Sequence, residues 1–389
     1  MRISRREFAA IGVGAAALAA GRIARGQLPV MPPERQVPND FPNQDGPGAE
    51  SLFKWKSLSP TDRVCFGQGG NALLMAVAHG AILIDTKLPG LGDTLKRESE
   101  AFGWPVNMVV LTHHHADHVG GTITFVKKQV ATVAHRNCPT RVLAQVERMM
   151  TSAANKLKEM EAADPPVPPK ALEEVRAFVD GAAGIKPVDF TARKGIRMEK
   201  QTMGMNELQV DLYHYGPGHT DNDVVVFMPG RNLLHTGDLL FNRVHPVIDL
   251  VGGADTRGWQ ERLKQIMDLC TESTVIVPGH GEVTDRTALQ EQYDYFDRLR
   301  GIVEQAHGQG KPREEIIATD VPEYAAYQRP QGLKVALGAI YDEMYNPPPP
   351  FKYPDSQTLP GNVYEEKGAK QKPDEPVTEK PSEPAPPRP

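Results

Sequence analysis

The sequence predicts an α/β fold with β-sheets at its centre. Two observations support this prediction: short apolar segments of strand length alternate with longer segments of helical periodicity, and several apolar segments end in polar residues. With 389 residues, of which 40% are hydrophobic and 24% charged, the chain can bury at least one full-sized core. We therefore expect one large domain with appendages.

The expected strands and helices follow from these patterns. His79-Gly80 separates two apolar runs and indicates a hairpin whose second strand ends at Asp85. The strand segments are 71–78, 81–85, 106–111, 208–215, 224–228, 232–236 and 274–277. The helical segments are 92–102, 140–160, a stretch that ends at Phe178, 257–270, 287–307 and 332–345.

Changes in composition divide the chain into parts. We expect a signal peptide over residues 1–26, a linker rich in Pro, Asn and Gly over 27–50, and a folded domain with C-terminal helices over 51–345. Within that domain, a helical insertion over one face is expected at about 140–195. The tail 346–389 is Pro-rich and nearly lacks apolar residues, so it is expected to be disordered, because it cannot bury enough surface to offset its ordering entropy.

The N-terminus has the layout of an export signal. A basic start that contains Arg5 and Arg6 precedes the apolar run from Phe8 to Ala20, which is too short to span a bilayer, and small residues follow before Gln27. The adjacent arginines resemble the twin-arginine type, which carries proteins across the membrane already folded. We expect a periplasmic or secreted protein without stable membrane insertion; a buried N-terminal helix or an uncleaved anchor is the alternative.

Charge and cysteine content exclude several classes of protein. The net charge is -5 and no long Lys/Arg run occurs, which argues against nucleic acid or an anionic membrane as the main partner. A small-molecule substrate is expected, and the oligomeric state is left open. Cys65, Cys138 and Cys270 form no Cys-x-x-Cys pair, so neither a zinc ribbon nor a disulfide scaffold is indicated.

The most informative segment follows the expected strand 106–111. It places four His and one Asp within the six positions from His113 to His118. Neutral imidazoles and carboxylates suit Zn²⁺, which prefers short N and O contacts. In an extended loop His113 and His115 point the same way, whereas Asp117 and His118 follow where the chain turns into a helix. One loop can therefore serve two adjacent metal ions.

Three later sites each end an apolar, strand-like run: His219 after Gly216-Pro217-Gly218, Asp238 after His235-Thr236-Gly237, and His280 after Val277-Pro278-Gly279. Each site is weak by itself, because a single His after a strand is more often a structural residue. Their order and placement together indicate a shared site.

In this order of motifs the sequence resembles the metallo-β-lactamase superfamily, from about Phe66 to Gly281. The resemblance implies a four-layered αβ/βα sandwich with metal ions in a cleft at one edge of the two sheets. It assigns His113, His115 and His219 to a first zinc ion, Asp117, His118 and His280 to a second, and Asp238 to both as a bridge. Asp85 would lie behind the ligands and orient them, with a turn-capping role as the alternative.

A dinuclear site of this kind implies hydrolysis. Two ions about 3.5–4 Å apart can share a water and lower its pKa towards neutrality, so no protein nucleophile is needed. Asp117 and Asp238 are the carboxylates expected to act in catalysis, because they offset part of the ions' charge. The expected cofactor is Zn²⁺, two per chain, with iron or manganese as alternatives.

Differences within the family narrow the activity. β-Lactamases proper carry Cys or Ser in place of Asp238, and oxygen-reducing diiron relatives carry Glu in place of His115. The nucleic-acid-processing branch has an extra domain for which the 42 positions from Asp238 to His280 (280 minus 238) leave no room. We expect hydrolysis of a small ester, lactone, thioester, amide or phosphoester. The alternatives are a β-lactamase-type hydrolase, a mononuclear iron persulfide dioxygenase and a non-catalytic metal-binding accessory protein.

Other polar residues have weaker support. His245 follows Asp238 closely enough to line the same cleft, so it is a candidate for binding substrate. The acids of Asp221-Asn222-Asp223 are expected to hold the turn after His219. Specificity is expected to lie in the insertion, because loops over a fixed metal scaffold shape the pocket. The pattern of the motifs gives no support for His114, His135, His214 or His235 as ligands.

Overall fold

The computed structural model describes residues 51–205 and 208–353, and all of them fall within one compact unit. The expected signal peptide, the linker and the tail from 354 onward lie outside the described residues. The described start of the tail, 346–353, contains no helix or strand. No helix in the described ranges combines the length and the apolar character needed to cross a membrane.

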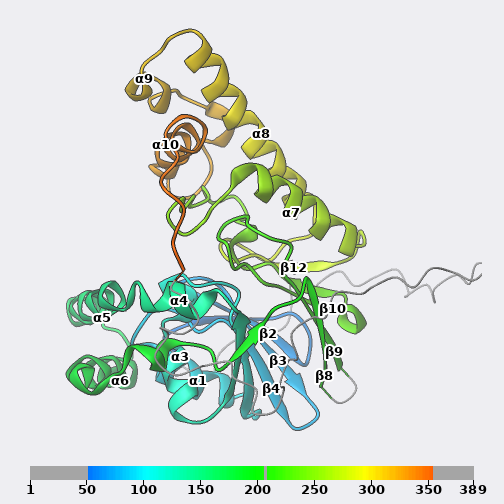
Figure 1. Ribbon diagram of the computed structural model, residues 1–389. Coiled ribbons are helices and arrows are strands. Elements are labelled where there is room, and N and C mark those ends of the chain that lie inside the picture. The colour runs from blue at the N-terminus through cyan, green and yellow to red at the C-terminus, as the bar shows by residue number, and fades with distance from the viewer. Residues whose placement is uncertain (1–50, 206–207, 354–389) are drawn as a thin grey trace, which may run out of the picture. The chain divides into compact units, whose positions relative to one another are not determined.

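Two sheets form the centre of the fold (Figure 1). The first has the strand order β1-β2-β3-β4-β5-β6-β7 and the second the order β12-β11-β10-β9-β8. The strands from β1 to β4 pair antiparallel and those from β4 to β7 parallel, whereas β8 to β11 pair antiparallel and β12 joins β11 in parallel. The bounds are β1 Lys54–Ser57, β2 Asp62–Phe66, β3 Ala72–Val77, β4 Gly80–Ile84, β5 Val106–Val110, β6 Ala131–His135, β7 Lys194–Ile196, β8 Lys200–Met205, β9 Leu208–Tyr213, β10 Val225–Met228, β11 Leu233–His235 and β12 Val275–Val277.

Side chains of β4 and β10 alternate between two cores. In β4, Ile82 and Ile84 pack in the core between the sheets, whereas Leu83 packs in the core under the helices of the first sheet. In β10, Val226 faces the inner core and Val225 faces the helices of the second sheet. Because successive side chains point to opposite faces, both sheets are covered on both sides. The order helix, sheet, sheet, helix confirms the predicted four-layered αβ/βα sandwich.

Helices close the two outer faces. The helices over the first sheet pack against it through buried side chains such as Leu95 and Phe125. Those over the second sheet pack through Trp259, Phe296 and Leu337. The bounds are α1 Gly92–Glu100, α2 Ala116–Val119, α3 Thr122–Lys127, α7 Thr256–Leu269, η3 Pro229–Arg231, η4 Gly237–Leu239, α8 Arg286–Gly308, α9 Arg313–Ile317, η5 Pro322–Tyr324 and α10 Gly332–Tyr345. Helices α7 and α8 each begin after an aspartate, Asp255 or Asp285, whose side chain accepts a backbone N–H bond of the first turn.

The segment between β6 and β7 is helical. It forms α4 (Cys138–Leu143), α5 (Val146–Glu161), α6 (Pro169–Asp180), η1 (Ala182–Gly184) and η2 (Pro187–Phe190), with α5 beside α6 (Figure 1). The prediction of a single helix over 140–160 is therefore wrong, because the segment forms two helices with a break before Val146. At the break, the buried Gln145 donates its side-chain amide to the carbonyl of His114 in the histidine-rich loop.

The expected hairpin is confirmed as the antiparallel pair β3–β4, and the expected helices near 92–102, 257–270, 287–307 and 332–345 are confirmed as α1, α7, α8 and α10. Strands β1, β2, β6, β7 and β8 were not expected. Their sequences are short or rich in polar residues, as in the Asp62–Phe66 and Lys200–Met205 strands, so they lack a clear apolar period.

Candidate metal centre

The predicted ligands lie where strands of both sheets end. His113 and His115 follow β5, and Asp117 and His118 lie in α2 directly after them. The other three come from the second sheet: His219 from the β9–β10 connection, Asp238 from η4 after β11, and His280 from the turn after β12. The structure brings all seven residues together in two groups that share one edge of the sandwich.

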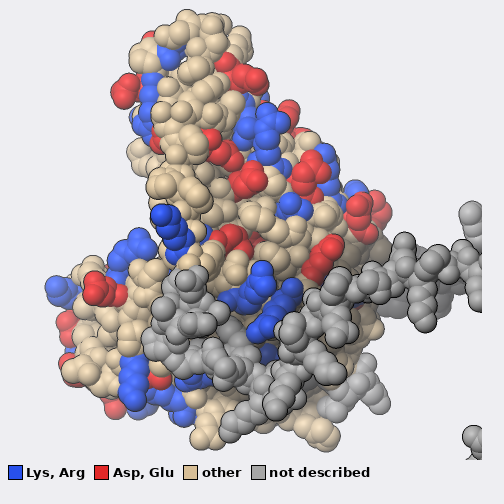
Figure 2. Space-filling model, viewed as in Figure 1, with Lys and Arg blue, Asp and Glu red and all other residues tan. Residues whose placement is uncertain are grey.

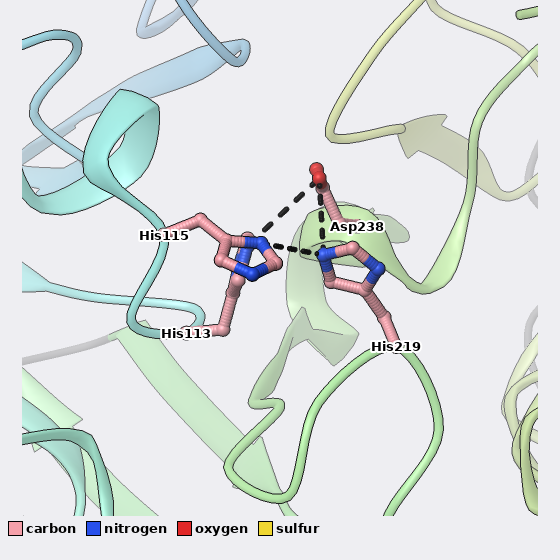
Figure 3. A group of neighbouring side chains, drawn as sticks. All are labelled: His113, His115, His219 and Asp238. Carbon is pink, nitrogen blue, oxygen red and sulfur yellow. Dashed lines mark hydrogen bonds and ion pairs between the residues drawn. The ribbon is translucent and has the colours of Figure 1, made fainter. Parts of the chain in front are cut away.

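The first group consists of His113, His115, His219 and Asp238 (Figure 3). Nδ1 of His115 lies 3.1 Å from Nε2 of His113 and 2.8 Å from Nε2 of His219. Oδ2 of Asp238 lies 3.4 Å from Nε2 of His219 and 3.8 Å from Nε2 of His113. Three imidazole nitrogens and one carboxylate oxygen therefore converge on one point.

The second group consists of Asp117, His118 and His280. Nε2 of His280 lies 3.3 Å from Oδ2 of Asp117 and 3.4 Å from Oδ2 of Asp238. Oδ1 of Asp238 lies 3.0 Å from Nε2 of His118. The Asp238 carboxylate thus faces both groups.

Hydrogen bonds fix the tautomers of two of the histidines. Nδ1 of His118 lies 2.7 Å from Oδ2 of Asp85, and because a carboxylate only accepts, this nitrogen carries the proton. The Thr112 hydroxyl donates to the same oxygen at 2.7 Å, so it must accept from Nδ1 of His113, which lies 3.0 Å away. In their neutral forms both imidazoles therefore turn an Nε2 lone pair towards the centre.

His115 is oriented by a residue that the sequence analysis missed. Its Nε2 lies 2.9 Å from Oδ2 of Asp249, so this nitrogen carries the proton and Nδ1 turns its lone pair to the first group. The other Asp249 oxygen accepts the backbone N–H of Gly252 at 2.9 Å, which holds the carboxylate in place. Asp249 lies 134 positions from His115 in an irregular loop, so no sequence motif could have indicated it.

Burial and charge set the protonation of the centre. Burial lowers the pKa of His219 to about 3 and holds the pKa of His113 well below its ordinary value, so both imidazoles are neutral. Burial opposes the ionised form of Asp238, yet the nearby His118 and His280 hold its pKa well below its usual range. Neutral His113 and His219 beside an ionised Asp238 are in the states that bind metal. Burial opposes the charged forms of His118 and His280, yet the neighbouring carboxylates raise the pKa of both, so a metal ion would displace protons from these two.

The donor set fits a metal ion better than it fits hydrogen bonding. Nε2 of His118 and Oδ1 of Asp238 are both buried, and neither has a hydrogen-bond partner of acceptable geometry although they lie 3.0 Å apart. Buried polar atoms are rarely left in this state unless water or an ion completes the site. Imidazole nitrogens and carboxylate oxygens without a sulfur ligand are a donor set that Zn²⁺ accepts.

Hydrogen bonds to backbone carbonyls join the two sheets at this edge. Asn71 donates its side-chain amide to the carbonyls of Pro278 at 2.9 Å and Gly281 at 2.8 Å, on either side of His280. Gly70 donates its backbone N–H to the carbonyl of Asp117 at 3.2 Å. The loop before β3 therefore ties the second sheet's last ligand to the loop of the first sheet.

The structure does not bring His245 into either group. It is buried, its Nδ1 lies 2.9 Å from the hydroxyl of Tyr295, and its ring packs against Tyr327. Asp223 holds the turn after His219 as expected, since its carboxylate accepts both the N–H and the hydroxyl of Thr220. Asp221 instead pairs with Arg141 of α4.

The histidines outside the ligand motifs have other partners. Nδ1 of His114 lies 2.9 Å from the side-chain amide of Asn222, although His114 also lies near His115 and Asp249 in a third group of metal-ligand type. His135 and His214 stack with ring centres 3.8 Å apart. Nδ1 of His235 accepts the N–H of Gly237.

Comparison with known proteins agrees with this geometry. The family model of the metallo-β-lactamase superfamily matches residues 66–280. The metallo-β-lactamase type 2 of Bacillus cereus is 23% identical over 229 residues, which cover 58% of this chain and 72% of the relative. The β-lactamase-like protein 2 homolog of Drosophila melanogaster is 27% identical over 277 residues, which cover 68% of this chain and 77% of that relative.

A solved structure supports the fold. The sec-alkylsulfatase Pisa1 from Pseudomonas sp. superposes with a TM-score of 0.53 at 17% identity, over 75% of this chain and 50% of that chain. The chain belongs to the metallo-β-lactamase superfamily. Its relatives include metallo-hydrolases such as the probable metallo-hydrolase YqjP of Bacillus subtilis, at 28% identity over 51% of this chain and 61% of that protein, which supports a hydrolase in general terms.

Proposed function

We propose that this protein is an exported dinuclear zinc hydrolase that cleaves a small ester, lactone, thioester, amide or phosphoester. The observation that carries the proposal is the position of Asp238. One oxygen lies 3.0 Å from Nε2 of His118 in the second group, and the other lies 3.4 Å from Nε2 of His219 in the first. A carboxylate in this position is suited to bridge two cations.

The residues of the two groups divide the chemical work. Two bound zinc ions would supply a hydroxide near neutral pH and would polarise the attacked oxygen. Asp238, whose side chain is 4% exposed, would contribute a carboxylate oxygen to each ligand group. Asp117 is the more exposed carboxylate at 28%, so in this proposal it would accept a hydrogen bond from the attacking water.

A small substrate is part of the proposal. On the face shown in Figure 2, basic and acidic side chains are interspersed over the C-terminal helices and form no single basic surface there. This mixture and the net charge of -5 favour a small molecule over a polyanion. Export rests on the N-terminal sequence with Arg5 and Arg6, which would place the enzyme in the periplasm or outside the cell.

The test compares Asp238→Asn with the unmodified protein, purified without chelator. The panel contains chromogenic esters, lactones, phosphodiesters and a β-lactam. We expect about two zinc ions per chain in the unmodified protein. In the variant we expect loss mainly of the second ion, because Asn removes a negative charge where two dications repel. Hydrolysis should fall by orders of magnitude.

A matched control separates this effect from unfolding. Asp62 is as buried as Asp238, at 4% exposure, but it pairs with Arg231 and not with a histidine. Asp62→Asn should therefore keep its metal whatever it costs in stability. Full activity and full metal in Asp238→Asn would refute the bridge. One iron per chain with oxygen uptake on a persulfide would indicate the dioxygenase. Absence of metal would indicate the accessory protein, and preferential hydrolysis of the β-lactam would indicate the β-lactamase.

A further inference from the structure

An arginine from outside the matched family region reaches the metal centre. Nη2 of Arg329 lies 3.5 Å from Nδ1 of His280, whose Nε2 faces the carboxylates of Asp117 and Asp238. The family model ends at residue 280, and Arg329 lies in the segment between η5 and α10. The C-terminal part of the chain, beyond the region matched by the family model, therefore supplies this contact.

Arg329 stands on the solvent side of the centre. The side chains of His113, His118 and His219 are at most 1% exposed and form its floor. Three other ligands are more open: 17% of the His115 side chain, 28% of Asp117 and 10% of His280 are exposed. Because Arg329 is itself exposed and contacts His280, its guanidinium lies on the more exposed side of the centre.

The backbone holds Arg329 in this place. Its φ is 59°, in the left-handed region that costs energy for residues other than Gly. Backbone bonds secure both sides: Gln328 donates to the carbonyl of Arg243 at 3.0 Å, and Gly332 donates to the carbonyl of Arg329 itself. His245 donates back to Gln328 at 3.3 Å. These bonds fix the point from which the Arg329 side chain extends towards His280.

The guanidinium of Arg329 has no acidic partner in the described part of the chain. Other arginines near the C-terminal helices do have one: Arg300 pairs with Glu343 at 2.8 Å, and Arg313 pairs with Asp342. The Arg329 side chain instead makes the long contact to His280. An arginine offers several donors in a planar fork that matches an oxyanion.

The contact to His280 cannot persist when His280 binds a metal through Nε2. A neutral imidazole that donates its Nε2 lone pair carries its proton on Nδ1. Arg329 can only donate, so two N–H groups would then face each other at this contact. The guanidinium must turn to another acceptor.

We propose that Arg329 is a substrate-binding residue that holds an oxyanion group of the substrate, a carboxylate, sulfate or phosphate, beside the metal centre. The proposal deepens the hydrolase function proposed above and rests on it. It assigns the enzyme to anionic substrates, and it places the residue that selects them in the C-terminal segment and not in the insertion between β6 and β7.

The test uses two esters with the same leaving group, neutral 4-nitrophenyl acetate and the carboxylate-bearing 4-nitrophenyl hydrogen succinate. Arg329→Asn removes the charge, and Asn tolerates the left-handed backbone. The matched control is Arg243→Asn, because Arg243 also has a positive φ of 54° and is exposed, but contacts Glu291 at 3.5 Å. Arg329→Lys keeps the charge without the fork.

We expect Arg329→Asn to raise KM for the succinate ester by about tenfold to a hundredfold, the usual effect of losing a hydrogen bond to a charged group. KM for the acetate ester, kcat for both esters and the metal content should stay as in Arg243→Asn. Arg329→Lys should recover part of the loss. Equal changes for the neutral and the anionic ester would overturn the proposal.

Direct binding provides a readout that needs no turnover. Calorimetry with acetate, sulfate and inorganic phosphate on the metal-loaded protein should show weaker binding to Arg329→Asn than to Arg243→Asn, and the tightest anion indicates the source of the oxyanion. If the protein hydrolysed no substrate of the panel described above, the hydrolase would be refuted while the anion site could still be measured. Equal anion affinity in the two variants would refute the anion site whatever the activity.

Discussion

Asp85 and His118 are joined by a 2.7 Å hydrogen bond between Oδ2 and Nδ1, and neither side chain is exposed to solvent. The same carboxylate accepts the N–H of Thr112 at 2.8 Å and its hydroxyl at 2.7 Å, and that hydroxyl contacts His113. One buried carboxylate thus orients a histidine from each of the two ligand groups. Groups behind the ligands commonly set affinity in this way.

Asp85→Asn is therefore expected to weaken both ligand groups at once. An amide has one acceptor oxygen where the carboxylate has two, so it cannot satisfy His118 and both donors of Thr112 together. Zinc affinity should fall by about tenfold to a hundredfold, measured by competition with a chromogenic chelator. Asp211→Asn is the control, since Asp211 is also buried but bonds Thr202 and Lys200. Equal zinc affinity in both variants would mean that Asp85 only caps the turn.

Local patterns in the sequence were sufficient to predict an α/β class, whereas the four-layered arrangement and the assignment of the candidate ligands came from the resemblance of the motifs to a known family. Strand-length apolar runs that end in His or Asp bring those side chains to one sheet edge, as for His113, Asp238 and His280. Alternation of side chains along β4 and β10 produced the layers. The hydrogen bond between Asp85 and His118 follows from the parallel pairing of β4 with β5.

The remaining features of the site depend on contacts that no local pattern encodes. Asp249 and Arg329 lie in irregular segments, and they approach His115 and His280 only because α7 to α10 pack on the second sheet. His245 was a candidate for binding substrate because it follows Asp238 closely in sequence. In the structure the chain turns at Arg243, which has a positive φ, and the His245 ring lies buried against Tyr295.

A stacked histidine pair is expected to make the fold less stable in acid. Burial, with smaller effects of His214 and Arg136, lowers the pKa of His135 to about 3, against about 6.5 in an unfolded chain. Between these values the unfolded chain takes up a proton that the folded protein does not. The contribution of His135 to the free energy of unfolding is therefore fully present above about pH 6.5. It falls as the pH drops towards 3, by up to about 1.4 kcal/mol per pH unit.

His135→Phe keeps an aromatic ring against His214 and removes the titrating group. The difference in urea midpoint between about pH 7.5 and pH 5 should be smaller in this variant than in the unmodified protein. His79→Phe is the control, because His79 is exposed in the turn between β3 and β4. An acid-induced loss that is as large in His135→Phe as in His79→Phe would show that the stacked pair is not responsible.

Gly70 leaves room for the His118 ring and is expected to be essential to the second ligand group. A Cβ at position 70 would overlap Cε1, Nε2 and Nδ1 of His118, which is fully buried and bonded to Asp85, so the imidazole has no space to yield. Gly70→Ala should therefore displace Nε2 of His118, with a loss of the second metal ion and a stability cost of about 1–3 kcal/mol.

Gly230→Ala is the matched control, because no heavy atom lies within 4 Å of a Cβ there. Metal analysis and urea unfolding of both variants check the prediction. The first group, His113, His115 and His219, should keep its ion in Gly70→Ala, since none of these residues is among the nearest atoms to that Cβ. Two ions per chain and an unchanged urea midpoint in Gly70→Ala would show that the loop before β3 can shift without disturbing His118.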